Sequence, residues 1–267
     1  MRWLGMVLAL CVGCGQTGGE FVDVPFSGQG TAAEPFVSGG WQVLLSEATI
    51  GFGPIFFCTT ESPDPRRCDP AILEFRDGVT LDGLDPSEQP IGELFGTTGT
   101  INTAFFDYGI VWLLTIPLPQ ALAGVPGGPA SVPFDTPNYE PGGHSGRFLG
   151  TATCVEGPDV CCPDADSCPA SYEFEAFVDV VPGTRGRPTI NGVEAPVTIT
   201  PEPASLLIGF DPSAWFRTVN YGRVAELVDE SGQAVLGPSD PDYNNIVIAM
   251  SGNPFPTFTW STTGTTE

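Results

Sequence analysis

The sequence predicts an all-β fold, an antiparallel β-sandwich or jelly-roll-like domain of about ten short strands with one or two short helices. Residues 172–181 carry the clearest strand pattern, because apolar side chains occupy the even positions while Glu173, Glu175 and Asp179 lie between them. A period of two with one polar side is typical of an antiparallel sheet that is exposed on one face. The 34 glycines and 28 prolines are interleaved with apolar segments, which indicates many turns and long loops.

Apolar and β-branched segments bounded by turn residues predict the strands of the first half of the chain, at 21–26, 41–52, 55–58, 71–75, 78–81 and 104–117. Pro25 favours an edge position for the first strand, because proline cannot donate to a neighbouring strand. The turn at 51–54 predicts that its flanking strands pair as a hairpin or form one bent strand, and Asp77-Gly78 predicts a second hairpin. The last segment is the most apolar, so we expect it in the centre of the core with a bulge at Gly109.

The second half of the chain predicts strands at 147–154, 172–181, 188–190, 193–200, 205–210, 246–250 and 257–260. Asp211 and Pro212 form an N-cap and first-turn pair that predicts a short helix reaching Phe216, and residues 221–228 predict a further helical turn. The Pro- and Gly-rich residues 117–146 predict a long surface loop.

These elements are expected to form a single sandwich domain over residues 21–260, followed by a polar tail at 261–267. The alternative is two smaller sandwiches that divide near residue 135.

The chain begins with the features of an export signal. Arg2 is followed by an apolar segment that is too short to cross a bilayer, which requires about 20 apolar residues. The segment ends in Val12-Gly13-Cys14, and uncharged residues follow. This ending resembles the lipobox of bacterial lipoproteins, while residues 20–267 resemble no family that we identify.

The resemblance to bacterial lipoproteins implies that residues 1–13 are a signal peptide that is removed. Cys14 would then become the new N-terminus and carry acyl chains, palmitate among them, with residues 14–20 as a flexible tether. Gly15 stands where an aspartate would mark retention in the inner membrane, so the resemblance implies an outer-membrane lipoprotein on its periplasmic or surface side. The alternative is an ordinary secretory signal that is cleaved elsewhere.

Six cysteines remain after the tether, and an even number in an exported protein predicts three disulfides. Cys58 and Cys68 are far from the others and bracket a loop, so we expect them to pair. The remaining four are expected to form two bridges among themselves: Cys154, Cys161, Cys162 and Cys168. Adjacent cysteines rarely have suitable geometry, so the two neighbours should take different partners. The alternative is a thiolate metal site, for which the spacing is irregular.

The net charge of −23 results from 9 Lys and Arg against 32 Asp and Glu. A chain this acidic is expected not to bind nucleic acid, because it repels phosphates and has no basic surface to release their counterions. It is also repelled by anionic lipid, which leaves the acyl anchor as the expected contact with a membrane. The partners compatible with this charge are cationic ligands, metal ions, neutral carbohydrates or other proteins, although the simpler explanation of the charge is solubility.

Catalytic patterns are weak in this sequence. Gly143-His144-Ser145-Gly146 is similar to a nucleophile elbow, but Arg147 replaces the final glycine of G-x-S-x-G. His144 is the only histidine. A serine hydrolase would have to use this histidine, adjacent in sequence to Ser145, as its base, and a blue-copper centre needs two histidines, so neither site is favoured. Glu173 and Glu175 would lie roughly 7 Å apart on one strand face, a spacing that fits a glycosidase but that a solvated sheet face explains equally well.

Calcium is the one cofactor that the sequence allows, and the alternative is that its carboxylates belong to solvated loops. Asp159, Asp164 and Asp166 lie in the cysteine-rich segment 154–169, and carboxylates on loops are ligands that Ca²⁺ prefers. No EF-hand spacing is present. No other cofactor is expected.

The interpretation that we favour is a lipid-anchored, non-enzymatic protein that binds or scaffolds a partner in the cell envelope. The long loops 117–146 and 154–169 can shape a binding surface, and Phe134 and Tyr139 are its candidate contacts. Two alternatives stay open. One is an envelope hydrolase that uses calcium or carboxylates, and the other is a metal-handling periplasmic partner protein.

Overall fold

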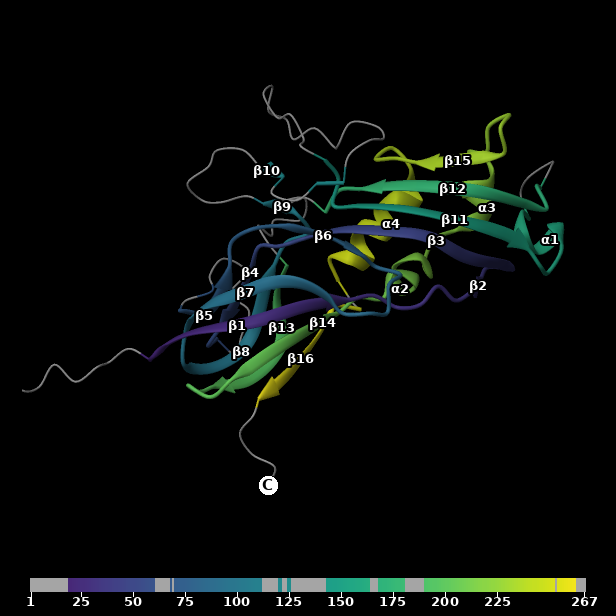
Figure 1. The fold of residues 1–267 in the computed structure, drawn as a ribbon. Helices are drawn as coiled ribbons and strands as arrows, with labels where there is room; N and C mark the ends of the chain where they lie inside the picture. Colours follow the sequence, from purple (N-terminus) through teal and green to yellow (C-terminus); the bar gives the residue numbers. More distant parts are fainter. Residues whose placement is uncertain are drawn as a thin grey trace, which may run out of the picture.

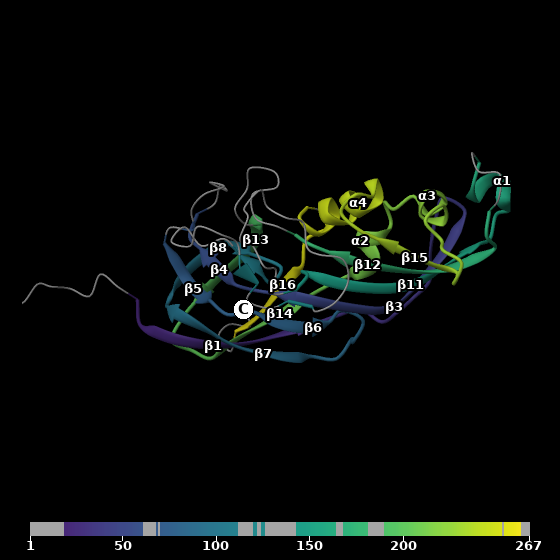
Figure 2. The ribbon, with the colours of Figure 1, turned by 90° about the horizontal axis from the view of Figure 1, so that it is seen from above.

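The computed structural model describes residues 19–60, 68, 70–111, 120–121, 124–125, 143–163, 168–180, 190–252 and 254–262. These residues form an eight-stranded sheet, a six-stranded sheet and a two-stranded ribbon, with four short helices. The expected all-β sandwich class is therefore confirmed. The molecule is elongated: the eight-stranded sheet occupies the half in which strand β1 begins, and the six-stranded sheet extends to helix α1 at the opposite end (Figures 1 and 2).

The eight-stranded sheet curls toward a barrel. Its strand order is β13 (Ile190–Ile199), β8 (Gly99–Phe106), β4 (Ile55–Cys58), β5 (Ala71–Phe75), β7 (Gln89–Thr97), β1 (Phe21–Gln29), β14 (Ala204–Gly209) and β16 (Thr257–Thr262). The two outermost strands, β13 and β16, contact each other. Inside the curl, the ring of Phe57 packs edge-on against Phe258 and Trp260, with centroids 5.7 and 5.0 Å apart. Aromatic side chains thus form the core of this half of the molecule.

The six-stranded sheet is covered on one face by helices. Its strands are β15 (Gln233–Leu236), β12 (Ser171–Val178), β11 (Gly146–Cys154), β3 (Trp41–Phe52), β2 (Phe36–Ser38) and β6 (Val79–Asp82), which pairs with the end of β3. The covering helices are α2 (Pro212–Phe216), α3 (Tyr221–Ala225) and α4 (Pro241–Met250), and α1 (Pro158–Cys161) lies beyond the end of the sheet (Figures 1 and 2). The separate ribbon pairs β9 (Ile110–Val111) with β10 (Gln120–Ala121).

Strand β12 shows how the predicted alternation is used. Tyr172 and Phe174 are buried on the helix side, where the Phe174 ring lies 5.9 Å from that of Phe216. Glu173 is exposed on the other face and Glu175 is half-buried there. The apolar period therefore fixes which face of this sheet receives the helices.

The two halves of the molecule share an aromatic core at their junction. The Phe52 ring lies 6.3 Å from Tyr108, and Tyr108 lies 5.8 Å from Trp215 of α2. Tyr108 is fully buried, and within the described part of the chain its hydroxyl has no hydrogen-bond partner. Because chain segments from both sheets and from α2 meet here, these rings hold the sheets together.

Several expectations about strand pairing are wrong. Pro25 is not on an edge strand, since β1 lies between β7 and β14; the proline is tolerated because the parallel pairing with β14 begins only at Phe26. Asp77-Gly78 does not close a hairpin, because β5 and β6 belong to different sheets. At 51–54 the bent-strand alternative is correct: β3 and β4 are not paired, and the chain passes from one sheet to the other through the cis Gly53–Pro54 peptide.

Other corrections concern the kind and extent of elements. Residues 246–250, expected as a strand, are the second half of helix α4, which begins at Pro241. The expected core strand 104–117 is interrupted, because β8 ends at Phe106 and β9 begins at Ile110; Gly109 between them has a φ of 71°, which favours glycine. Strands β2, β7, β10 and β15 were not anticipated, and residues 261–262 belong to β16. The two strands expected at 188–190 and 193–200 are one strand, β13, from Ile190 to Ile199, while residues 188–189 lie outside the described residues.

The sheets are mixed and not purely antiparallel, because β1 pairs with β14 and β12 with β15 in parallel. Both pairs join segments far apart in the sequence, as a parallel crossover requires. Each sheet also combines strands from before and after residue 135, such as β3 with β11 and β1 with β14. A division of the chain near that residue would therefore separate paired strands in both sheets.

Candidate functional site

A groove of about 330 Å³ lies at the α1 end of the molecule. It is lined by Ser38, Gly39, Val160, Cys161, Pro163, Arg217, Thr218, Val219, Asn220 and Tyr221. These residues come from three separate segments: the β2–β3 turn, the disulfide-tied segment around α1, and the connection from α2 to α3. The groove thus exists only because the fold brings these segments together.

The first wall of the groove is the tight turn between β2 and β3. Ser38 pairs with Trp41 across the strands, so Gly39 and Gly40 form a two-residue hairpin loop, with φ values of 55° and 81°. Such loops need positive φ at both positions, which glycine adopts without strain. The Ser38 hydroxyl donates to the Arg217 carbonyl at 3.0 Å and fixes this wall to the third segment.

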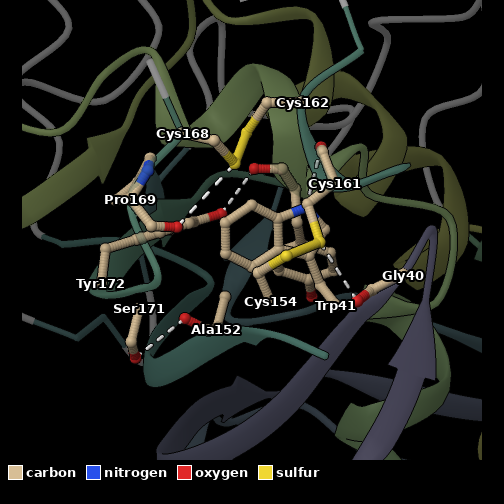
Figure 3. The surroundings of a disulfide bond; sticks show 11 residues. Gly40, Trp41, Ala152, Cys154, Cys161, Cys162, Cys168, Pro169, Ser171 and Tyr172 are labelled. Carbon is tan, nitrogen blue, oxygen red and sulfur yellow. Dashed lines mark hydrogen bonds between the residues drawn. A yellow bond between two sulfur atoms is a disulfide. The ribbon is translucent and has the colours of Figure 1, made fainter. Parts of the chain in front are cut away.

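The second wall is held by disulfides. The structure contains the three bridges that the cysteine count predicts, Cys58–Cys68, Cys154–Cys161 and Cys162–Cys168, and the two adjacent cysteines take different partners. Figure 3 shows Trp41 lying beside the Cys154–Cys161 bridge. The Trp41 indole nitrogen donates to the Cys161 carbonyl at 3.1 Å, and Trp41 is fully buried. The short segment around α1 is therefore attached to the sheet core, which holds Val160 and Cys161 in place.

The third wall is organised by a buried carboxylate, Asp242 at the start of α4. One of its oxygens accepts the Asn220 backbone N–H at 2.8 Å and the Asn245 side-chain amide at 3.1 Å, and the other forms an ion pair with Arg223 at 3.0 Å. Asn220 also caps α3 by accepting the Arg223 backbone N–H at 3.2 Å. The conformation of 217–221 is thus set by hydrogen bonds before any ligand arrives.

Two buried tyrosines complete the support of this wall. The Tyr172 hydroxyl donates to the Tyr221 carbonyl at 2.7 Å, and the Tyr221 hydroxyl donates to the Phe216 carbonyl at 3.1 Å. Burial raises the pKa of both phenols well above the usual value, and the nearby Asp242 carboxylate raises it further. Both side chains therefore stay neutral donors at any physiological pH.

Arg217 gives the groove its charge. The structure describes four arginines, and Arg76, Arg147 and Arg223 each form an ion pair with a carboxylate. Within the described residues Arg217 has no such partner; its guanidinium lies over the Phe36 ring, 5.3 Å from the centroid. In a chain with 32 acidic residues, a cation that faces a groove without a carboxylate partner is unusual.

The groove can therefore hold a small ligand in an open, pre-formed site. Val160, which is 48% exposed, and Pro163 offer apolar contact on one side, while Arg217 and the polar side chains of Thr218 and Asn220 line the other. Apolar lining with a few convergent polar groups is typical of ligand sites. Among the described residues, the lining contains no His, Asp or Glu side chain.

A second polar cluster is buried at the ends of β11 and β12. His144 Nδ1 lies 2.8 Å from an Asp179 carboxylate oxygen, and both residues are almost completely buried. The Asp179 backbone N–H donates to the Tyr243 hydroxyl at 2.9 Å, and the Val180 N–H donates to the Ser145 hydroxyl at 3.0 Å. The His144–Asp179 pair and these bonds join the strand ends to α4.

This buried cluster does not support the serine-hydrolase pattern. Ser145 is fully buried, and its oxygen accepts from a backbone amide, while the neighbouring His144 faces Asp179. The Gly-His-Ser-Gly sequence leads into β11, which begins at Gly146, and does not form a strand-to-helix turn. A serine hydrolase needs the histidine to accept the proton of the serine hydroxyl. Here the His144 ring lies beside Asp179 and the Ser145 hydroxyl is bonded to Val180.

Asp107 is a third buried polar group, between β8 and β9. Its backbone N–H and carbonyl bond to Pro54 and Gly53, but its carboxyl has no hydrogen bond or ion pair in the described residues. Burial raises the pKa of this carboxyl well above its usual value. Asp107 is therefore a neutral acid over part of the pH range in which other aspartates are ionised.

Most of the residues that the sequence singled out lie outside the groove. Cys14, Phe134, Tyr139, Asp164 and Asp166 lie outside the described residues. Asp159 is exposed in the first turn of α1, and within the described residues no group of three His, Cys, Asp or Glu side chains could hold a metal ion. The calcium site stays an untested prediction.

Glu173 and Glu175 are on the open face of the six-stranded sheet, as their alternation predicts. Glu175 accepts from Arg147 at 2.7 Å, and Arg147 also pairs with Glu47 at 2.9 Å. These bonds and the Glu47 and Glu175 charges hold the pKa of the arginine above its usual value. Glu175 is thus one member of a cross-strand ion-pair group, which fits the solvated sheet face better than a pair of catalytic acids.

The sequence contained two signals for the groove that were not used. Gly39-Gly40 between apolar strands is a two-residue hairpin signal, and Asn220 before an apolar helical turn is an N-cap signal. Neither shows that the two turns meet. No helix in the described part of the chain is long and apolar enough to cross a membrane.

Comparison of the chain with protein-family models found no match, and comparison with curated proteins found none either. Among solved structures, the chain is similar to MbnP from Methylosinus trichosporium, at 12% sequence identity and a TM-score of 0.34, over 92% of this chain and 99% of that chain. A likeness of this size carries no argument about function.

Proposed function

We propose that this protein is a lipid-anchored, non-enzymatic binding protein of the bacterial cell envelope. The observation that carries the proposal is the groove between the β2–β3 turn, α1 and the α2–α3 connection, which is pre-formed and lined for binding. The lipobox-like Val12-Gly13-Cys14 supports the anchor. The three disulfides support an oxidising compartment outside the cytosol.

The position of the groove fits a protein held at its other end. Strand β1 begins at the end of the molecule opposite α1 (Figures 1 and 2). Residues 14–20 span at most about 25 Å when fully extended, at roughly 3.5 Å per residue. An acylated Cys14 would thus hold the β1 end near the membrane and leave the groove directed away from it.

Chemical-shift mapping tests binding at the groove. The probes are blocked dipeptides and neutral monosaccharides, each added at millimolar concentration to the protein without its signal peptide. We expect at least one probe to shift the backbone amides of 38–39, 160–163 and 217–221. Val160→Trp would fill the groove and remove the shifts, whereas Val155→Trp, at a 51% exposed valine outside the lining, would keep them.

Shifts confined to another surface, or equal loss of binding in the two tryptophan variants, would contradict the groove as the binding site. The two valines are a matched pair, because both are exposed on the disulfide-tied segment and only Val160 lines the groove.

A further inference from the structure

We infer that the groove takes a carboxylate whose neighbouring group is apolar, as at the C-terminus of a peptide that ends in an aliphatic residue. This inference rests on the proposed function, since it names the ligand class of the same groove. It follows from three features of the lining: the cation, its fixed position, and the apolar wall that faces it.

The cation is Arg217, and it lacks the carboxylate partners that the other described arginines have. Arg147 has Glu47 and Glu175, Arg223 has Asp242, and Arg76 has Glu74. Asp242 is the carboxylate closest in the hydrogen-bond network of this wall, and its oxygens are already used by Arg223, Asn220 and Asn245. A carboxylate ligand could therefore bind the Arg217 guanidinium without breaking an ion pair among the described residues.

Arg217 is also held in position. The Ser38 bond to its carbonyl fixes its backbone, and its guanidinium, on an exposed side chain, lies over the Phe36 ring of β2 at 5.3 Å from the centroid. A guanidinium stacked on a ring retains its edge N–H groups for a ligand, and its planar fork matches the geometry of a carboxylate. Less side-chain entropy is lost on binding when the cation is already ordered.

The facing wall selects what stands next to the carboxylate. Val160 and Pro163 present apolar surface, and Val160 is exposed although it lies beside fully packed residues such as Cys161. An aliphatic side chain beside the carboxylate would be removed from water against this surface, which favours binding. Thr218 and Asn220 add polar groups at the charged side. The lining therefore fits an amphipathic ligand with one anionic end.

The net charge of −23 does not oppose this assignment at physiological salt. The Debye length there is about 8 Å, so distant carboxylates are screened while a contact inside the groove is much less affected. Selectivity for the anion is thus a local property of Arg217 and not of the whole surface.

Titration calorimetry with N-acetyl-leucine and its uncharged amide tests the inference. We expect the acid to bind about tenfold tighter or more, because a hydrogen bond to a charged group contributes roughly 1.5–3 kcal/mol. Arg217→Gln should remove the difference between the two probes. Arg76→Gln, which changes the same residue type at an exposed site paired with Glu74, should leave it unchanged.

Glucuronate is the third probe, and it separates the two sources of a carboxylate. Weaker binding of glucuronate than of N-acetyl-leucine supports the peptide C-terminus, and the reverse result would overturn that choice. Equal binding of the acid and the amide, with loss in Val160→Trp, would overturn the carboxylate inference while the groove remained a binding site. If no probe binds, the inference is wrong, and the shift mapping decides separately whether the groove binds anything.

Discussion

Replacing Cys154 and Cys161 with alanine is expected to lower the free energy of unfolding by about 2–4 kcal/mol, the usual contribution of a disulfide. The two cysteines are 7 residues apart in the sequence, so part of the loss comes from the larger freedom of the unfolded loop. The remainder comes from the folded state, because Cys161 is buried and its carbonyl accepts from the Trp41 indole. Denaturant unfolding under non-reducing conditions measures this loss.

The matched variant replaces Cys162 and Cys168, which are 6 residues apart. The chain-entropy contribution is nearly the same for the two bridges, since it depends only on the logarithm of loop length. Only the first variant should shift the Trp41 indole resonance and weaken ligand binding in the groove. If both variants leave that resonance and the binding unchanged, the Cys154–Cys161 bridge does not brace the groove.

Asp107→Asn is expected to stabilise the protein increasingly as the pH rises from about 4 to 8. Burial raises the pKa of Asp107 in the folded state, so over this range the folded protein binds more protons at this site than the unfolded chain does. Stability then falls with rising pH until the folded-state pKa is passed, and the asparagine variant lacks that loss. The gain grows with the difference between the pKa of Asp107 in the folded protein and in the unfolded chain, by about 1.4 kcal/mol for each pKa unit.

Thermal melts at several pH values measure this effect, with Asp229→Asn as the control. Asp229 is fully exposed, and the Ser231 hydroxyl, with neighbouring backbone N–H groups, holds its pKa below the usual value. Its contribution therefore has the opposite sign and is lost as the pH falls into the acid range. A wild-type melting curve that runs parallel to that of Asp107→Asn from pH 4 to 8 would show that Asp107 is not buried without a partner.

The strands that the sequence predicted well are those with a strict period of two or an unbroken apolar segment between turn residues. Residues 172–181 gave β12, which ends at Val178 and buries Tyr172 and Phe174 as expected, whereas Asp179, expected on the polar side, is buried. Residues 41–52 gave β3 with the same bounds. Residues 246–250 failed because a short apolar segment fits a buried strand and a helix equally well. Asp240 and Pro241 before it were the helix-start signals that could have decided between them.

Pairing was harder to predict than strand existence. Asp77-Gly78 has the composition of a hairpin turn, yet the strands on its two sides, β5 and β6, belong to different sheets. Strand pairing depends on which apolar faces meet across the core, and the turn residues alone do not determine this. The Cys58–Cys68 pair was predicted correctly because these two cysteines are far from the others. For the other four, the sequence predicted two bridges with different partners for Cys161 and Cys162, and the structure shows that the pairs are Cys154–Cys161 and Cys162–Cys168. The groove was beyond sequence reasoning, since its three segments lie far apart in the chain and nothing in the residues around Arg217 shows that it lacks a carboxylate partner.

The proposed acyl anchor at Cys14 would determine the compartment of the protein and the direction in which the groove faces. Mass spectrometry of the N-terminal peptide from detergent-extracted membranes tests it most directly, with Cys14→Ser as the matched variant. We expect a mature chain that begins at Cys14 and carries a diacylglyceryl group and an acyl chain, and we expect the serine variant to leave the membrane fraction. An unmodified N-terminus at any other residue would contradict the lipid anchor.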